Sequence, residues 1–266
     1  MSRDIWNPRV YGRYADERSR PFFDLVARIA ARSPRRVVDA GCGTGELTAT
    51  LAERWPEAEV HGFDSSPAML AGALSGAFSG IPATGGLSFS VEDVIRWSPR
   101  EPVDVIVSNA VLQWVPGHRD LLPRWVEALA PGGWLAFQVP GNFGAPSHAL
   151  VHELCRTTWR DRLADLVRPA PVGEPAEYHD LLAGAGCRVD AWETTYLHVL
   201  TGEETVLRWI TGSFLRPMLD RLSPEEGDDF LHDCSDVLAR AYPRGPHGTL
   251  FPFRRIFVVA QKMTEK

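Results

Sequence analysis

The stretch VVDAGCGTGE, residues 37–46, decides the fold predicted for this chain. An apolar run ends in an acid and is followed by glycines at every second position. This pattern is typical of a buried strand that breaks into a tight turn at a ligand, because glycine adopts unusual φ values and lets backbone N–H groups approach a ligand closely. The residues expected at that ligand are Asp39, Gly41, Cys42, Gly43 and Gly45.

A second apolar segment, Val60–Asp64, ends in another acid. Its place in the chain is close to the interval of about 20 residues at which such an acid reaches a pair of ribose hydroxyls. We therefore expect Asp64, with Ser65 beside it, to bind a ribose. Nicotinamide-dependent oxidoreduction is the competing interpretation, but it favours the pattern G-x-G-x-x-G. Here Gly45 comes one residue early, which disfavours a dinucleotide.

Apolar segments rich in β-branched residues alternate with helical segments from Arg36 to Ala136, which is typical of a parallel sheet covered on both faces. The predicted fold is α/β, a doubly wound, mostly parallel, seven-stranded sheet with helical insertions. The first five strands are predicted at Arg36–Ala40, Val60–Asp64, Leu87–Val91, Val103–Asn109 and Trp134–Val139. The helices between them are predicted at Glu46–Trp55, Pro67–Leu74 and Asp120–Ala130. Ser66 before Pro67 predicts an N-cap, and Pro131-Gly132-Gly133 predicts a helix end.

The segments outside this core predict a helical cover. A helix at Glu17–Ala31 carries apolar residues at helical spacing, so residues 1–31 are expected to pack over the first strand. Segments 142–175 and 199–250 are predicted to form a lid over the glycine turn. The remaining predicted elements are helices at Tyr178–Ala185, Glu203–Leu219 and Pro224–Ala241, and strands at Val189–His198 and Arg255–Gln261.

Length and composition favour a single globular domain over residues 1–266, with its ligand-binding core at 36–140. A chain of 266 residues with 44% hydrophobic content buries roughly three quarters of its unfolded surface. The net charge of −6 and the pI of about 5.8 disfavour nucleic acid and anionic membranes as partners. No apolar run approaches the roughly 18 residues of a membrane span and the first residues are polar, so we expect a cytoplasmic protein.

Cysteine and histidine spacings do not predict a metal site. The cysteines are Cys42, Cys155, Cys187 and Cys234. Their spacing fits neither a zinc site nor a disulfide framework, so reduced thiols are expected. His148 and His152 lie one helical turn apart with Glu153 beside them, but the order is not that of a zincin and no third ligand is evident. An ordinary helix face is the favoured interpretation.

The ends of the third and fourth strands supply further candidates, because an open parallel sheet binds its ligand beyond the carboxyl ends of its strands. Asp93, followed by Val94, stands where an acid can accept a hydrogen bond from an adenine amino group. Asn109 and Ala110 are expected to line the reacting end. A structural role is the alternative for both sites, with Glu92 and Asp93 capping a loop and Asn109 turning the chain.

Four motifs are VDAGCGTG (38–45), HGFDSS (61–66), DVIVSNA (104–110) and LAPGGWL (129–135). In this order they resemble the S-adenosylmethionine-dependent class I methyltransferases. The resemblance implies that S-adenosyl-L-methionine is the methyl donor and that no metal takes part. It also implies that Asp39 with the glycines holds the methionine part, Asp64 the ribose and Asp93 the adenine.

Further segments are less widespread than the glycine motif: WNPxxY (6–11), ERSRP (17–21), LQW (112–114), TTYxH (194–198), LRP (215–217) and FPxRxxF (251–257). Over nearly the whole chain they resemble the trans-aconitate 2-methyltransferase family. That likeness implies a small-molecule O-methyltransferase that forms the monomethyl ester of trans-aconitate or a related polycarboxylic acid. A carboxylate has a reference pKa near 4 and is ionised at neutral pH, so no general base and no catalytic side chain are expected.

The acceptor carboxylates that do not react need cationic partners, and a guanidinium group meets a carboxylate through two parallel hydrogen bonds. Tyrosine and histidine supply neutral donors, and tryptophan supplies a wall. The predicted substrate-binding residues are Tyr11, Arg18, Arg20, Trp114, His179, Tyr196, His198, Trp209, Arg216 and Arg254.

Two other functions stay open at this point. In one, the enzyme class is the same but the acceptor is a phenol, an amine or an apolar carboxylic acid. In the other, the chain is a binding module that senses the adenosyl ligand without turnover. The favoured interpretation predicts a monomer whose partner is a small molecule.

Overall fold

The structure is a computed structural model that describes residues 15–78, 80, 84–167, 170–212 and 214–264. The chain forms two compact units. The first comprises Met1–Val139, Val172–Glu193 and Ile256–Lys266, and the second comprises Pro140–Pro171 and Thr194–Arg255. The predicted core lies in the first unit and most of the two predicted insertions lie in the second. That the insertions act as a lid stays a prediction.

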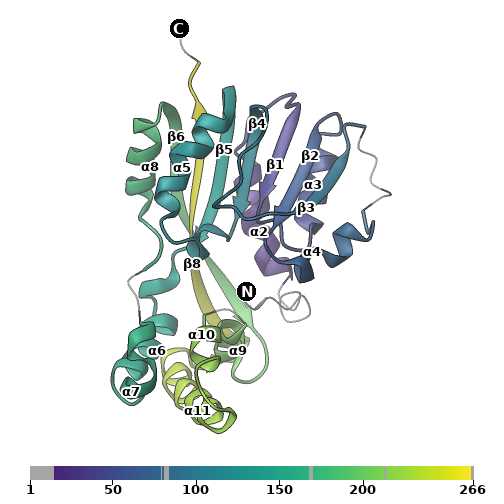
Figure 1. The fold of residues 1–266 in the computed structure, drawn as a ribbon. Helices are drawn as coiled ribbons and strands as arrows, with labels where there is room; N and C mark the ends of the chain where they lie inside the picture. Colours follow the sequence, from purple (N-terminus) through teal and green to yellow (C-terminus); the bar gives the residue numbers. More distant parts are fainter. Residues whose placement is uncertain (1–14, 79, 81–83, 168–169, 213, 265–266) are drawn as a thin grey trace. The chain divides into compact units, whose positions relative to one another are not determined.

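A mostly parallel sheet forms the centre of the first unit (Figure 1). The strand order is β3-β2-β1-β4-β5-β8-β6, and a short β7 pairs with β8. The strands are β1 (Arg36–Ala40), β2 (Glu59–Asp64), β3 (Leu87–Val91), β4 (Val103–Asn109), β5 (Leu129–Pro140), β6 (Cys187–Leu200), β7 (Arg244–Gly245) and β8 (Gly248–Lys262). The doubly wound α/β prediction is confirmed, with the seven predicted strands forming the continuous path.

The topology places the candidate site. β1 pairs in parallel with β2 on one side and with β4 on the other, and β2–β3 and β4–β5 are also parallel. The chain therefore moves outward in one direction from β1 through β2 to β3 and then in the other direction through β4 to β5. Such a reversal is the point at which open α/β sheets bind ligands, beyond the carboxyl ends of the strands.

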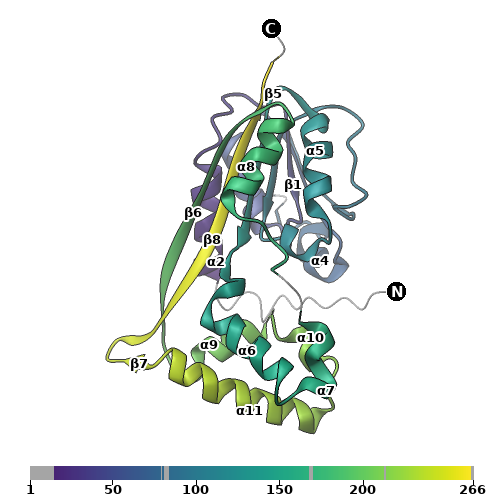
Figure 2. The ribbon, with the colours of Figure 1, turned by 90° about the vertical axis from the view of Figure 1, so that its left-hand side faces the viewer.

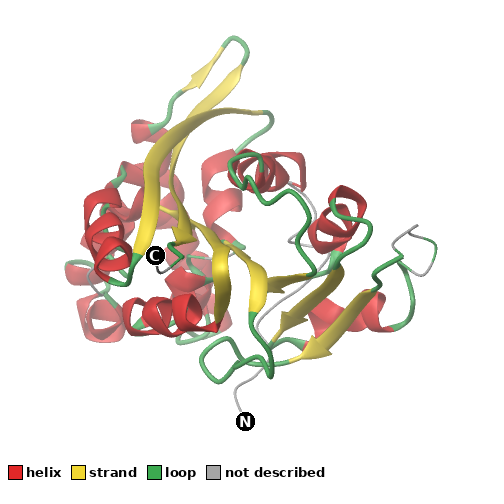
Figure 3. Cartoon of the chain, turned by 90° about the horizontal axis from the view of Figure 1, so that it is seen from above, coloured by secondary structure: helices red, strands yellow, loops and turns green. Residues whose placement is uncertain are grey.

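Helices cover both faces of this sheet (Figure 3). Those of the first unit are α2 (Ala15–Val26), α3 (Glu46–Arg54), α4 (Pro67–Leu74), α5 (His118–Ala128) and α8 (Pro175–Gly184), with a 3-10 turn η2 at Leu112–Trp114. Figure 2 shows α5 and α8 on one side of the sheet and α2 on the other. As predicted, α4 is capped by Ser66, whose Oγ accepts a hydrogen bond from the amide of Met69 at 3.2 Å.

The second unit is helical around the outer parts of β6 and β8. Its helices are α6 (Pro146–Arg156), α7 (Arg160–Leu163), α9 (Thr205–Thr211), α10 (Arg216–Leu219) and α11 (Pro224–Ala241), with 3-10 turns η3 (Asn142–Gly144) and η4 (Ala164–Leu166). Trp159 joins α7 to α11, since its indole Nε1 donates to Asp233 Oδ2 at 2.8 Å and its ring meets Phe230 edge-on. Across both units, no helix among the described residues is long and apolar enough to cross a membrane.

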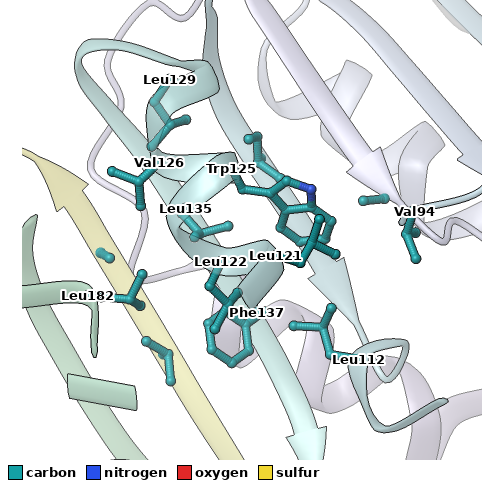
Figure 4. Packing of buried hydrophobic residues seen from close by; sticks show 14 of the residues in the cluster. Val94, Leu112, Leu121, Leu122, Trp125, Val126, Leu129, Leu135, Phe137 and Leu182 are labelled. Atoms are coloured by element: carbon teal, nitrogen blue, oxygen red, sulfur yellow. The ribbon is translucent and has the colours of Figure 1, made fainter. Parts of the chain in front are cut away.

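A hydrophobic core cluster lies between the sheet and α5 (Figure 4). Trp125 of α5 is 1% exposed and packs in a cluster that includes Phe137 of β5 and Leu182 of α8. Fully burying a large apolar side chain contributes about 1.5–3 kcal/mol to folding. This packing fixes β4 and β5, and with them the residues that follow β4.

Two helix ends differ from the sequence prediction. The helix predicted to reach Ala31 ends at Val26, because the amides of Arg28 and Ile29 bond to carbonyls three residues back and so tighten the last turn. The helix predicted to run to Ala130 ends at Ala128, and β5 begins at Leu129. Ala130 precedes a proline, which disfavours the helical conformation, so the PGG segment lies in an irregular stretch of β5.

Three elements beyond the core also differ in extent. The helix predicted at Glu203–Leu219 is two short helices, α9 and α10, with Gly212 at the end of the first. The strands predicted at Val189–His198 and Arg255–Gln261 are longer, as β6 and β8. In β8 the buried Phe251 and Phe253 alternate with exposed neighbours, so this extension has the period of a strand with one buried face rather than the continuous apolar run of the core.

Candidate functional site

The glycine turn after β1 has the backbone geometry that its sequence predicts. Gly41, Gly43 and Gly45 have φ values of +82°, +59° and +84°, a region that favours glycine. A Cβ at Gly41 would lie 2.3 Å from Cγ2 of Val111, and a Cβ at Gly45 would lie 2.7 Å from the ring of Phe89. The turn therefore packs closely against the segment after β4 and against β3.

The amides of the turn bond within the protein. Those of Gly41 and Cys42 donate to the carbonyl of Phe63 at 2.8 and 2.9 Å, and that of Gly45 donates to the carbonyl of Cys42 at 3.1 Å. The amide of Gly43 donates to Asp64 Oδ2 at 2.9 Å. The glycine pattern predicts that these N–H groups face a ligand. Here they join the end of β1 to the end of β2 and so place Asp64 beside the turn.

Asp39, at the end of β1, is a buried acid. Its Oδ2 accepts a hydrogen bond from Thr48 Oγ1 of α3 at 2.7 Å, and the residue is 3% exposed. Burial raises the pKa of this carboxyl to about 7, the Thr48 bond opposes the rise, and the charge of Asp64 adds to it. A buried acid at a topological switch point, with a pKa near neutrality, is typical of a functional site.

Asp64 is held by two backbone amides. Gly43 donates to its Oδ2 and Ser66 donates to its Oδ1, both at 2.9 Å. Its own carbonyl accepts from the amide of Glu92 at 3.1 Å, which joins the ends of β2 and β3. The carboxylate is half-buried and Ser65 beside it is exposed. Asp64 is thus fixed by the backbone at the edge where its role is predicted.

Cys42 lies between the glycines but is not a nucleophile. Burial raises the pKa of its thiol, and the negative charges of Asp39 and Asp64 raise it further. A cysteine that acts in chemistry needs a lowered pKa, because the thiolate is the reactive form. Cys42 is therefore a protonated side chain of the turn.

The end of β3 shows the loop geometry of the alternative interpretation. Asp93 is exposed and its Oδ1 accepts from the amide of Ile95 at 2.9 Å, while Val94 is buried in the core cluster. The cap explains one carboxylate oxygen of Asp93. Its contact with an adenine stays a prediction.

The end of β4 has an unusual backbone. Ala110 has a φ of +57°, the left-handed region, and its amide donates to the carbonyl of Gln138 at 2.9 Å. The side-chain Oδ1 of Asn109 is buried and has no hydrogen-bond partner among the described residues. Buried acceptors and strained backbone both gather at functional sites.

The predicted acceptor residues fall into both units. In the first unit Arg20 is exposed on α2, Trp114 in η2 is 42% exposed, and His179 on α8 lies 3.1 Å from Asp180 Oδ1. Arg18 belongs to α2, and its side chain is not described. Tyr11 lies outside the described residues.

The second unit brings together three predicted aromatic residues. The His198 ring stacks on Trp209 of α9 with centroids 4.9 Å apart, and Tyr196 lies 6.3 Å from His198 along β6. Phe253 of β8 packs against both His198 and Trp209. These side chains form a buried aromatic cluster.

Arg216 and Arg254 also belong to the second unit and are half-buried. Arg216 begins α10. The backbone of Arg254 is fixed on both sides, since its amide donates to Asn142 Oδ1 at 2.6 Å and its carbonyl accepts from Gly141 at 2.9 Å. Substitution of the Arg254 side chain leaves both of these bonds in place.

Sequence reasoning missed several residues of the site. The hydrogen bond from Thr48 offsets part of the free-energy cost of burying Asp39. A threonine inside a helix carries no sequence pattern that predicts this bond. Asn142 fixes the backbone of Arg254 from a distant segment. Gln113 lies in the LQW motif, and its amide Nε2 donates to the carbonyl of Ala110 at 2.6 Å. Only the motif pointed to it.

No group of three or more His, Cys, Asp or Glu in the described part of the chain is arranged to hold a metal ion. His148 and His152 lie on α6 against the ring of Phe214, with centroid distances of 4.1 and 5.2 Å. Burial lowers the pKa of His148 to about 4, and the charge of His152 adds to the shift.

A family model and the relatives that match this chain agree on its family. A family model described as a methyltransferase domain matches residues 14–191. A trans-aconitate 2-methyltransferase of Streptomyces avermitilis is 52% identical over 97% of this chain and 97% of its own length. Proteins of the same name from Rhodococcus jostii and Mycobacterium tuberculosis are 53% and 50% identical, each over 97% of this chain and over 99% and 97% of their own lengths.

Solved structures match the fold at low sequence identity. The YcgJ protein of Bacillus subtilis has a TM-score of 0.57 at 15% identity, covering 90% of this chain and 97% of its own. Phosphoethanolamine N-methyltransferase 2 of Haemonchus contortus, in complex with S-adenosyl-L-methionine, has a TM-score of 0.54 at 18% identity. The alignment covers 92% of this chain, which spans about half (53%) of the nematode protein. These matches support the fold.

Proposed function

The chain belongs to the methyltransferase family, and on that premise we propose that it transfers the methyl group of S-adenosyl-L-methionine to a carboxylate of trans-aconitate, giving a monomethyl ester. The choice of acceptor rests on sequence identity. Relatives named trans-aconitate 2-methyltransferase are 50–53% identical to this chain over nearly their full length.

The residues at the switch point fit the donor. Asp64 is fixed at the end of β2, where an acid reaches a ribose. Asp39 is buried at the end of β1, and a nearby cationic ligand would favour its ionised form. The buried Oδ1 of Asn109 is an acceptor still without a donor among the described residues. Gly41, Cys42, Gly43 and Gly45 form the turn between these groups.

The chemistry asks for positioning rather than for acid–base catalysis. A carboxylate oxygen attacks the sulfonium methyl in line, the carbon–sulfur bond breaks, and the products are the methyl ester and S-adenosylhomocysteine. The nucleophile is ionised at neutral pH, so no proton has to be removed. Holding donor and acceptor in near-attack geometry supplies about 7–11 kcal/mol of the barrier.

Two arginines are assigned to the acceptor. Arg216 and Arg254 are half-buried in the second unit, and a guanidinium group binds a carboxylate through paired hydrogen bonds. They bind the carboxylates that do not react, because a guanidinium on the attacking oxygens would lower their nucleophilicity. Tyr196, His198 and Trp209 belong to the same unit and line the acceptor side under this proposal.

The test is turnover with a panel of acceptors. Purified protein is incubated with S-adenosyl-L-methionine and, separately, with trans-aconitate, cis-aconitate, citrate, a monocarboxylic acid, a phenol and an amine. We expect methyl transfer to trans-aconitate above all, with a product that mild alkali hydrolyses. A product stable to alkali, or preference for the phenol or the amine, contradicts the proposal.

Arginine variants separate the polycarboxylate from other acceptors. In Arg216→Gln and Arg254→Gln we expect KM for trans-aconitate to rise about 10- to 100-fold, because a hydrogen bond to a charged group is lost. The affinity for S-adenosylhomocysteine should stay unchanged. Arg208→Gln is the matched control, since Arg208 is an exposed arginine of the same unit on α9. An equal rise of KM in the control would contradict the assignment of Arg216 and Arg254 to the acceptor.

Under this proposal the protein acts as a monomer in the cytoplasm. Light scattering coupled to gel filtration checks the first point, and fractionation of the source cells checks the second. A dimer at working concentration, or the protein in the membrane fraction, contradicts it.

A further inference from the structure

The turn after β4 contains a conformation that alanine rarely adopts. Ala110 has a φ of +57°, and among the described residues other than glycine only Glu204 shares the positive sign. The left-handed region brings Cβ close to the carbonyl oxygen, so it persists only where neighbouring groups hold it. Something must therefore fix Ala110.

Two hydrogen bonds hold Ala110. Its amide donates to the carbonyl of Gln138 at 2.9 Å, and its carbonyl accepts from Nε2 of Gln113 at 2.6 Å. A carbonyl oxygen is an acceptor, so the nearby atom of the Gln113 side chain is the amide nitrogen. Gln113 thereby closes a short loop on the residue whose backbone is strained.

The same turn contains two buried acceptors. Oε1 of Gln113 and Oδ1 of Asn109 have no hydrogen-bond partner among the described residues. Buried polar atoms are nearly always hydrogen-bonded, so an exception calls for an explanation such as a bound ligand or water. Both acceptors are therefore available to a donor outside the described residues.

The turn after β4 also packs against the glycine turn after β1. Val111 follows Ala110 and packs against Gly41. A Cβ on Gly41 would lie 2.3 Å from Cγ2 of Val111. A change in the conformation of Ala110 would move Val111 and with it the surface that the glycines face. Both segments belong to the first unit, at the switch point of the sheet.

We propose that Gln113 is a positioning residue of the donor site, whose side-chain amide holds Ala110 in the left-handed conformation that binding of the S-adenosyl ligand requires. The inference rests on the proposed function for the identity of the ligand. Gln113 acts through Ala110, and the loss of its amide lets the turn relax to an ordinary conformation that fits the ligand less well.

The test measures binding of S-adenosylhomocysteine by calorimetry to wild type, Gln113→Leu, Ala110→Gly and the double variant. Leucine has the size of glutamine without its donor, so we expect about tenfold weaker binding. Glycine adopts a positive φ without strain, so in the Ala110→Gly background the same Gln113→Leu change should weaken binding by about twofold or less. With trans-aconitate as acceptor, Gln113→Leu should raise KM for the methyl donor and leave KM for the acceptor unchanged.

The matched control is Gln261→Leu. Gln261 Nε2 donates to the carbonyl of Gly132 at 3.1 Å, and Gly132 also has a positive φ of +78°. This bond resembles that of Gln113 but lies in the irregular stretch at the start of β5. We expect Gln261→Leu to lower the melting temperature and to leave the affinity for S-adenosylhomocysteine unchanged.

The outcomes separate this inference from the proposed function. Wild type that fails to bind S-adenosylhomocysteine overturns the proposed function. If wild type binds and a folded Gln113→Leu binds with equal affinity, the positioning role alone is overturned. The positioning role is also overturned if Gln113→Leu weakens binding equally with alanine and with glycine at position 110. If Gln113→Leu does not fold, Gln113→Met replaces it under the same criteria.

Discussion

At the scale of single residues, Gly41 is subject to two constraints at once, as is Gly45. Its φ of +82° is unfavourable for a residue with a Cβ, and that Cβ would overlap Val111. We expect Gly41→Ala to lower the free energy of unfolding by about 2–5 kcal/mol, the sum of backbone strain and overpacking. Urea unfolding measures the change.

Gly76→Ala is the control for the steric part. Gly76 has a φ of +86°, and a Cβ there would have no atom within 4 Å. Only the backbone term of about 1–2 kcal/mol applies. Equal destabilisation in the two variants would mean that the contact of Gly41 with Val111 contributes nothing.

Asp39 makes stability depend on pH. Its pKa is raised from the ordinary 3.8 to about 7, so the folded state binds its proton more tightly than the unfolded state. The resulting stabilisation is complete below pH 4 and is lost as pH rises through about 7. In Asp39→Asn the carboxamide oxygen still accepts from Thr48 and no proton is lost. We expect the variant to be on the order of a few kcal/mol more stable than wild type at pH 8.

Urea unfolding at pH 5 and pH 8 checks this. The difference between variant and wild type should be larger at pH 8 than at pH 5. A difference that does not vary with pH would show that the Asp39 carboxyl titrates at its ordinary value.

The sequence predicts candidate donor-site residues but not the hydrogen bonds that they make. Asp39, the glycines and Asp64 are candidates because an acid after an apolar run and glycine at fixed spacing are local patterns. That the amides of Gly41 and Cys42 bond to Phe63 was not predictable, since such bonds depend on the register between β1 and β2. The strain at Ala110 was hidden because the residues that bond to its backbone, Gln138 and Gln113, carry no sequence pattern that predicts these bonds.

At the scale of elements, α5 and α8 are joined by a buried polar contact within the apolar cluster. The hydroxyl of Tyr178 lies 2.8 Å from His118 Nε2 and accepts from the amide of Gly173 at 3.0 Å. Tyr178 is 0% exposed. We expect Tyr178→Phe to cost about 1–3 kcal/mol, because it leaves a buried amide without an acceptor.

Thermal unfolding and urea titration measure this cost, with S-adenosylhomocysteine affinity as the second observable. The affinity should not change, since α8 lies outside the glycine turn. A stability equal to wild type would show that water replaces the tyrosine hydroxyl.

Elements were predictable where the pattern was continuous and failed where local chemistry competed with it. The core strands were placed from apolar runs and punctuation. The end of α5 was misplaced because the proline after Ala130 excludes helix earlier than the PGG signal suggests. The outer parts of β6 and β8 were missed because strand residues there alternate between buried and exposed, a weaker signal than a buried run.

At the scale of the whole molecule, two compact units share strands. β6 runs across the boundary at Glu193 and Thr194, and β8 runs across the boundary at Arg255 and Ile256. No composition shift or linker announces the second unit in the sequence, because its residues come from two segments separated by a helix and half of a strand. The prediction of one domain with insertions rested on chain length and hydrophobic content instead.

The shared strands predict that the units unfold together. Breaking either unit frays β6 and β8 and so removes backbone hydrogen bonds from the other, which makes partial unfolding costly. S-adenosylhomocysteine, bound at the switch point of the first unit at about 100 times its Kd, should add about 2.7 kcal/mol to the stability of everything that unfolds with that unit. Hydrogen exchange of the amides in α3 and in α11 tests this, because α3 belongs to the first unit and α11 to the second. We expect the slowest amides of both helices to gain the same protection on addition of the ligand. Added protection in α3 alone would mean that the second unit opens independently. Binding of the donor would then have no effect on the residues assigned to the acceptor.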